Sequence, residues 1–196
     1  MCSEKIAIFC ILFSHSFVLL YMSKFIFLDF DGVLTTARYH NMLRRCSVAT
    51  IDRFGELFDP QAVANLRMIL ERTRAKLVIT SSWRTEGLDV MRDLWHTRIL
   101  PGQIADITPF YLYGAFRHSS AEEPFAGFTS GSRGMEIAEW LIRNAEPHTP
   151  YVILDDEEDI LLRQTDRFVK IDAETGITPE NARQAIELLK DERKYE

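Results

Sequence analysis

The chain has 196 residues, a formal net charge of −6 and three cysteines. This length suits one α/β domain with a complete core and is too short for two large domains. The negative charge argues against a protein that holds duplex nucleic acid through a broad basic surface. Cys2, Cys10 and Cys46 have neither zinc-ligand spacing nor an even count, so they indicate no structural zinc site and no disulfide framework.

The N-terminal segment is strongly apolar from Ile6 to Met22, with one lysine before the run. Such a run can be a signal peptide or a single membrane anchor. Its length is marginal for a membrane span, and no small-residue cleavage motif follows it. We therefore expect residues 1–22 to be a dispensable extension, and residues 23–196 to form one cytoplasmic domain. A membrane-anchored or exported protein is the alternative.

The first predicted strand lies in residues 25–34, FIFLDFDGVL, where an apolar run ends in Asp29 and Asp31 and is followed by Gly32. Apolar residues on both faces predict a strand covered on both sides, as in a parallel sheet. Side chains alternate along a strand, so both carboxylates point the same way. Like charges at this spacing need a compensating cation or a shared proton.

Further along the chain, predicted helices and strands alternate. Polar residues 35–59 predict a loop or a short helical insertion, and Asp59 with Pro60 predicts the start of a helix. The remaining predicted elements are a strand at 76–80, helices at 85–96 and 133–144, strands at 151–154 and 168–171, and a C-terminal helix capped by Thr178. Residues 100–131 are expected to be the least regular part and to wrap over the site. This alternation predicts an α/β fold with a doubly wound parallel sheet.

A second acidic cluster follows the strand at 151–154, where the residues from Asp155 to Asp159 read DDEED. The carboxyl ends of parallel strands meet at one edge of the sheet, so this cluster should join Asp29 and Asp31. Carboxylates gathered there require a metal ion. Oxygen ligands without a cysteine or histidine cluster favour Mg²⁺ over zinc.

Four motifs in order make the chain resemble the haloacid dehalogenase (HAD) superfamily of phosphohydrolases. They are D-x-D-G-V at 29–33, a strand-terminal Thr or Ser at 80–81, a basic residue at Arg133 and an acidic pair at 155–156. The smaller motifs T-S-S-W-R, R-G-x-E-I-x-x-W-L, I-L-D-D and D-x-x-T-G-I-T resemble the HAD domain of Swiss Army knife RNA repair proteins. The resemblance implies a Rossmann-like HAD fold with a small or minimal cap insertion, at about residues 35–59.

The resemblance also implies a mechanism and a metal. Asp29 would attack phosphorus and form an aspartyl-phosphate, and Asp31 would act as general acid and then as general base. Mg²⁺ would be held by Asp29, the Asp31 carbonyl and Asp155. Asp156 or Asp159 would support the metal from further out or orient Arg133.

The other candidate residues would bind the substrate. Thr80 is the expected hydroxyl donor to the phosphoryl oxygens, with Ser81 as the alternative. Arg133 stands where the family usually has lysine. Arginine keeps the positive charge but replaces the single ammonium donor by a broad guanidinium fork. Gly32 permits the turn that aims both acids. Arg84 either contacts substrate or caps backbone carbonyls, and both readings stay open. Two tryptophans, Trp83 and Trp140, are expected in the core and receive no functional role.

The function predicted from these residues is a Mg²⁺-dependent phosphomonoester hydrolase that acts on a nucleotide or a polynucleotide end. The alternatives are a small-metabolite phosphatase or phosphotransferase, and a non-catalytic HAD-like binding module. The partner is expected to be a phosphorylated substrate, without a strong nucleic-acid-binding surface, and a membrane only if residues 6–22 are retained.

Overall fold

The computed structural model describes residues 23–110 and 132–190, and their centre is a five-stranded parallel sheet. The strands run in the order β5-β4-β1-β6-β7. Their bounds are β1 (Phe25–Leu28), β4 (Lys76–Ile79), β5 (Ile104–Ile107), β6 (Tyr151–Asp155) and β7 (Phe168–Lys170). The chain adds β4 and β5 on one side of β1 and then crosses to β6 on the other side. The predicted doubly wound α/β fold is thereby confirmed, and its crossover point lies between β1 and β6.

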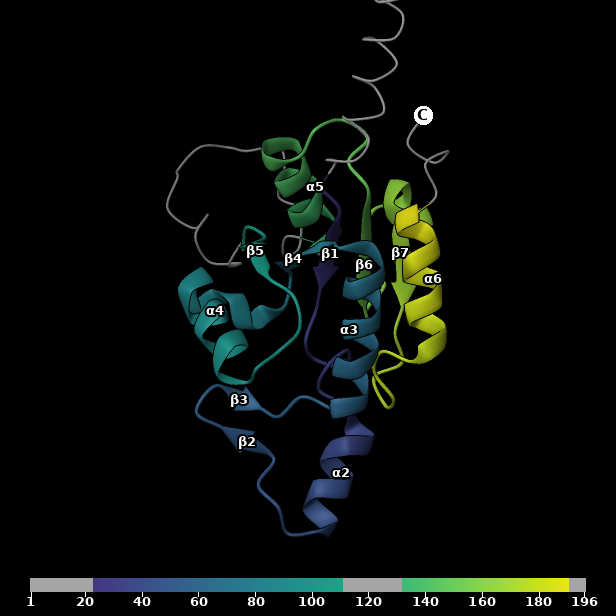
Figure 1. The fold of residues 1–196 in the computed structure, drawn as a ribbon. Coiled ribbons are helices and arrows are strands. Elements are labelled where there is room, and N and C mark those ends of the chain that lie inside the picture. Colours follow the sequence, from purple (N-terminus) through teal and green to yellow (C-terminus); the bar gives the residue numbers. More distant parts are fainter. Residues whose placement is uncertain (1–22, 111–131, 191–196) are drawn as a thin grey trace, which may run out of the picture.

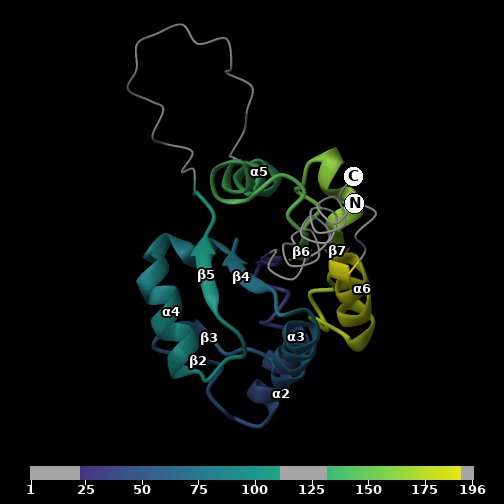
Figure 2. The same ribbon diagram turned by 45° about the horizontal axis from the view of Figure 1, so that its top comes forward.

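Helices cover both faces of the sheet (Figures 1 and 2). One face carries α3 (Pro60–Thr73), α4 (Leu88–Thr97) and α6 (Pro179–Lys190), and the other carries α5 (Arg133–Asn144). In β1, Ile26 and Leu28 pack into the first layer, whereas Phe25 and Phe27 pack against Trp140 of α5. Because side chains alternate along a strand, the residue after Leu28 faces α5.

Several helix boundaries follow directly from capping residues. Asp59 precedes α3 and accepts a hydrogen bond from the Gln61 N–H at 2.8 Å, with Pro60 as the first helical residue. Thr178 accepts the Asn181 N–H at 3.2 Å at the start of α6. The helix predicted at 85–96 is instead divided at Gly87, whose φ is 95°, into a short 3-10 helix η1 (Ser82–Glu86) and α4. A positive φ is the conformation that glycine tolerates best, so the division occurs there.

Residues between β1 and α3 form helix α2 (Ala37–Arg45) and a two-stranded hairpin, β2 (Ile51–Asp52) and β3 (Gly55–Glu56). The hairpin lies beside α4 (Figure 1). Arg98 donates two hydrogen bonds to the Asp52 carboxylate at 3.0 and 2.7 Å, and Arg53 pairs with Asp93 at 3.1 Å. These charge-assisted contacts attach the hairpin to the end of α4.

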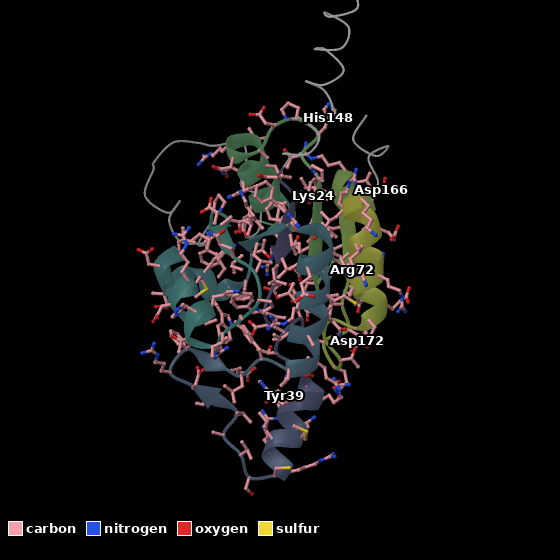
Figure 3. The ribbon with its side chains drawn as sticks, in the orientation of Figure 1. Lys24, Tyr39, Arg72, His148, Asp166 and Asp172 are labelled. Carbon is pink, nitrogen blue, oxygen red and sulfur yellow. The ribbon has the colours of Figure 1, made fainter. Side chains whose placement is uncertain are left out.

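The hairpin and α2 lie at the carboxyl end of the sheet. Figure 3 shows Lys24, which immediately precedes β1, well above Tyr39 of α2, on the side of the molecule that is toward His148. Asp172, which follows β7, lies toward the same end as Tyr39 (Figure 3). Any site built at the strand ends therefore faces α2 and the hairpin.

The prediction that residues 100–131 are irregular is wrong for 104–107, which form the edge strand β5. Only four residues long and containing Asp106, this strand lacks the apolar run that marks the central strands. Asp106 is tolerated because it accepts a hydrogen bond from Trp140 Nε1 at 2.7 Å. Residues 111–131 and the apolar segment 1–22 lie outside the described residues. Within 23–110 and 132–190, no helix combines the length and apolarity needed to cross a bilayer.

Candidate active site

Three polar residues form a row across the carboxyl edge of the sheet. The strand register pairs Leu28 with Ile79 of β4 and with Leu154 of β6, so the next row is Thr80, Asp29 and Asp155. Backbone bonds continue the pairing into this row, from the Thr80 N–H to the Leu28 carbonyl at 2.9 Å and from the Asp29 N–H to the Leu154 carbonyl at 3.1 Å. The three side chains follow apolar residues in alternation, so they share the face that α5 covers.

Arg133, the first residue of α5, reaches this row. Its Nη1 donates to Asp29 Oδ1 at 3.1 Å and to the Thr80 carbonyl, and its Nε lies 3.4 Å from Asp155 Oδ2. Burial by itself lowers the pKa of Arg133, but the Asp29 and Asp155 carboxylates outweigh burial and raise that pKa above its ordinary value. A fixed positive charge thus bridges the two buried acids.

The start of α5 is held by the acidic loop after β6. Asp159 Oδ2 accepts the Arg133 backbone N–H at 3.0 Å, and the Asp159 carbonyl accepts the Gly134 N–H at 2.9 Å. A Cβ at Gly134 would clash with the backbone nitrogen of Leu161 and lie 2.8 Å from the carbonyl carbon of Ile160, so glycine is needed for this close approach. Asp159 thus caps the first turn of α5 through backbone N–H groups, and its two expected roles, metal support and orientation of Arg133, stay predictions.

Three carboxylates gather beside Arg133. Oxygen atoms of Asp29, Asp155 and Asp156 all lie within 4.8 Å of one another. Burial raises the pKa of Asp29 to about 7. The positive charge of Arg133 lowers this pKa, and the negative charges of Asp155 and Asp31 raise it further. Burial also raises the pKa values of Asp155 and Asp156. The proximity and burial of these acids disfavour their ionised forms unless a cation joins them.

The donor set fits a hard divalent cation. The three side chains that converge offer carboxylate oxygens, which Mg²⁺ prefers. Oδ2 of Asp155 is buried and, among the described residues, has no hydrogen-bond partner, although Arg133 is near enough for an ion pair. An unsatisfied buried carboxylate oxygen is what a bound cation would satisfy. The side chain of Asp31 stands outside this three-residue cluster.

Gly32 and Asp31 shape the exposed rim of the site. Gly32 has a φ of 69°, and a Cβ there would lie 2.6 Å from Asp156 Cγ. Only glycine permits both this backbone conformation and this contact. Asp31 is exposed, and both of its carboxylate oxygens lie 3.1 Å from Trp83 Nε1. Partial burial raises the pKa of Asp31, the Trp83 hydrogen bond opposes that rise, and the charge of Glu56 adds to it.

The two hydroxyls at the end of β4 have different surroundings. Ser81 Oγ accepts the Trp83 backbone N–H at 3.4 Å and so caps η1. Thr80 is fully buried, and within the described part of the chain its Oγ1 has no hydrogen-bond partner. The unsatisfied hydroxyl therefore stands in the same row as Asp29, as a candidate ligand for a polar group of a substrate.

Arg84 is buried among protein acceptors. Its Nε donates to the Thr108 carbonyl at 3.2 Å, and its Nη1 to the carbonyls of Thr80 and Ser81. The remaining nitrogen, Nη2, donates to the Pro109 carbonyl at 3.2 Å and pairs with Glu136 of α5. These contacts engage all five guanidinium N–H groups. Of the two readings of Arg84, the structure shows the carbonyl-capping one.

Sequence reasoning missed two residues of this region, Glu136 and Trp83. Glu136 follows Arg133 by three residues, which puts both on one side of the first helical turn, and this spacing was the available signal. Trp83 was expected only in the core, because no sequence pattern indicates that its indole N–H reaches Asp31 from another strand end.

The fold and the site together define the class of this protein as a Rossmann-like α/β protein with an acidic, metal-compatible site at the carboxyl ends of its central strands. Residues 25–182 match a family model described as the HAD domain in Swiss Army Knife RNA repair proteins. The chain therefore belongs to this family of HAD domains, which confirms the resemblance noted from its motifs. Membership implies phosphohydrolase-type activity in an RNA repair context. A search of curated proteins returned no match.

Proposed function

We propose that this protein is a Mg²⁺-dependent phosphohydrolase that acts on a phosphomonoester through an aspartyl-phosphate. The observation that carries the proposal is the row of Asp29 and Asp155 on adjacent strands, bridged by Arg133. A buried nucleophile, a set of metal-compatible acids and a fixed positive charge are the components that phosphoryl transfer needs.

Asp29, Asp155 and Asp156 would hold the ion, because their oxygens converge and one of them is unsatisfied. When bound, Mg²⁺ would reduce the repulsion between the Asp29 carboxylate and an anionic phosphate and would stabilise the charge that develops during transfer. Arg133 contributes positive charge at the same place without the ion.

Asp29 is the proposed nucleophile. One of its carboxylate oxygens forms a bond to phosphorus while the ester P–O bond breaks, and Asp31 gives its proton to the leaving oxygen. A water molecule then attacks the phosphoaspartate, transfers a proton to Asp31 and releases inorganic phosphate and the Asp29 carboxylate. Asp31 is suited to this exchange because it lies on the exposed rim, where the leaving group and water enter.

Arg133 and Thr80 are the proposed phosphate ligands. Arg133 already donates to Asp29, and a guanidinium fork can turn part of its donor set to phosphoryl oxygens. The unsatisfied Oγ1 of Thr80 offers a further donor in the same row.

A nucleotide or a polynucleotide end is the proposed substrate class, supported by the family and by the small size of the α2–hairpin insertion. A small-metabolite phosphatase or phosphotransferase would use the same two acids. A binding module without turnover is disfavoured, because binding requires neither a nucleophile nor a second acid two residues later.

The test is hydrolysis of an aryl phosphate with and without Mg²⁺, by the wild type and by Asp29→Asn. We expect Mg²⁺-dependent release of phosphate that Asp29→Asn abolishes. Activity that survives this substitution would overturn the nucleophile assignment, and no activity on any monoester would favour the binding module. Comparison of 3′- and 5′-phosphorylated oligonucleotides with mononucleotides and sugar phosphates then identifies the substrate class.

A further inference from the structure

Trp83 contacts the site directly, because its indole nitrogen lies 3.1 Å from each of the two carboxylate oxygens of Asp31. The two residues come from different strand ends, Asp31 after β1 and Trp83 after β4. An indole nitrogen can donate a hydrogen bond but cannot accept one, so Trp83 is the donor and the Asp31 carboxylate is the acceptor.

The indole is held from several sides. Its ring packs edge-on against Phe30 at a centroid distance of 5.6 Å and lies 5.8 Å from the Phe58 ring. The guanidinium of Arg98 lies 5.8 Å from the same ring. A Cβ at Gly55 would lie 2.9 Å from the ring, so the hairpin approaches the indole as closely as glycine allows. Trp83 is therefore a rigid donor rather than a mobile surface side chain.

Asp31, by contrast, is exposed and directly precedes a turn, across which it forms an isolated bridge with Thr35. An exposed carboxylate that lacks packing neighbours samples several side-chain rotamers. A donor shared between both oxygens restricts rotation of the carboxyl group about its Cβ–Cγ bond. The packed Trp83 ring thereby restrains Asp31, an acid of the site that packing does not bury.

We infer that Trp83 is a positioning residue that orients Asp31 for proton transfer to the leaving group. The inference rests on the proposed function, in which Asp31 is the general acid. Trp83 acts through Asp31, and the β2–β3 hairpin contributes by packing Gly55 against the indole. Correct placement of a proton donor matters most when the leaving group is basic, because a weakly basic leaving group departs without protonation.

The test variant is Trp83→Phe, which keeps an aromatic ring and deletes the N–H. We compare kcat/KM for phenyl phosphate and para-nitrophenyl phosphate, two esters of similar shape whose leaving groups differ in basicity. Trp83→Phe should lower kcat/KM about tenfold for phenyl phosphate, a part of the 10²–10⁴-fold that a well-placed general acid contributes. The loss for para-nitrophenyl phosphate should be less than about threefold.

The chain contains a matched control, because Trp140 Nε1 also donates to an aspartate, Asp106, at 2.7 Å. Trp140→Phe should leave the ratio of the two kcat/KM values as in the wild type. In an Asp31→Asn background, Trp83→Phe should change the ratio no further, since the group that it positions is already gone. An equal loss for both esters, or a ratio that still changes in that background, would overturn the inference.

A second measurement needs no metal and no turnover. In the metal-free protein, the Trp83 indole N–H resonance should shift and exchange faster with water in Asp31→Ala, while the Trp140 resonance stays in place. Asp31 is exposed, so this variant should fold even if Trp83→Phe does not. An unchanged Trp83 resonance would overturn the inference. A wild type that hydrolyses neither ester contradicts the proposed function instead, which keeps the two failures distinct.

Discussion

Asp29 and Asp155 occupy matching positions on adjacent parallel strands, one residue beyond the pair Leu28 and Leu154. Each is buried, and together with Asp156 they bring oxygens within 4.8 Å of one another. Arg133 contacts both acids yet leaves the pKa of each above its ordinary value. The site is thus electrostatically incomplete without a further cation, and this gives it measurable properties.

The stability of the metal-free protein should fall as pH rises toward neutrality. Burial raises the pKa of Asp29 from 3.8 to about 7, so between these values the folded protein keeps a proton that the unfolded chain has released. The unfolded state binds fewer protons there, and the free energy of unfolding therefore decreases with rising pH. Asp29→Asn should flatten this slope in thermal melts with chelator present. The control is Asp93→Asn, at an exposed site on α4, which should keep the wild-type slope. A wild-type slope in Asp29→Asn would contradict the assignment of the pH dependence to Asp29.

Mg²⁺ should stabilise the folded protein through the same acids. At a concentration of about 100 times Kd, a ligand bound only by the folded state adds about 2.7 kcal/mol to the free energy of unfolding. Asp155→Asn should remove most of the rise in Tm, because it replaces the carboxylate whose Oδ2 is unsatisfied. Glu180→Gln, on the surface of α6, is the control. An equal rise in Tm for Asp155→Asn and wild type would place the ion elsewhere.

Gly32→Ala should weaken both stability and Mg²⁺ binding. The new Cβ would lie 2.6 Å from Asp156 Cγ and would push that carboxylate away from the cluster, in addition to the strain of a φ of 69°. Gly87→Ala is a close control, since its φ is 95° and a Cβ there meets nothing within 4 Å. Both variants should lose stability, by about 1 kcal/mol or more from the backbone alone. Only Gly32→Ala should weaken Mg²⁺ affinity in a calorimetric titration.

Arg84→Ala should be strongly destabilising. The guanidinium is buried, pairs with the buried Glu136 and satisfies several carbonyls at the ends of β4 and β5. Removing one member of a buried ion pair costs about 3–5 kcal/mol. The exposed pair Arg183–Glu180 provides the contrast, because Arg183→Ala should cost at most about 1 kcal/mol. Chemical denaturation measures the free energy of unfolding of both variants. Similar decreases in Arg84→Ala and Arg183→Ala would contradict the structural role of Arg84.

Arg133→Lys should lower activity more than stability. Lysine keeps the positive charge, but a single ammonium cannot reproduce the fork that contacts Asp29, Asp155 and the Thr80 carbonyl. We expect about a tenfold decrease in kcat/KM for an aryl phosphate, in line with the loss of one charge-assisted hydrogen bond. Full activity in Arg133→Lys would show that the fork geometry is unnecessary.

Much of the fold could be predicted from local patterns. The apolar runs of β1, β4 and β6 and the cap at Asp59 are local signals, and the structure confirms them. Edge strand β5 was missed because it has one hydrogen-bonded neighbour and a polar residue, Asp106, which only a partner from α5 makes acceptable. The break at Gly87 was missed for a related reason, since a single glycine within an apolar periodicity is compatible with a continuous helix.

By itself, the amino-acid sequence determined which acids stand at strand ends, because strand periodicity and the order of β and α segments are properties of neighbouring residues. Only the tertiary structure decided which oxygen atoms meet. The strand register sets Thr80, Asp29 and Asp155 in one row, and the docking of α5 on the acidic loop brings in Arg133. Contacts such as Trp83 with Asp31 join segments 52 residues apart, and their formation depends on packing of the whole domain, which no local pattern encodes.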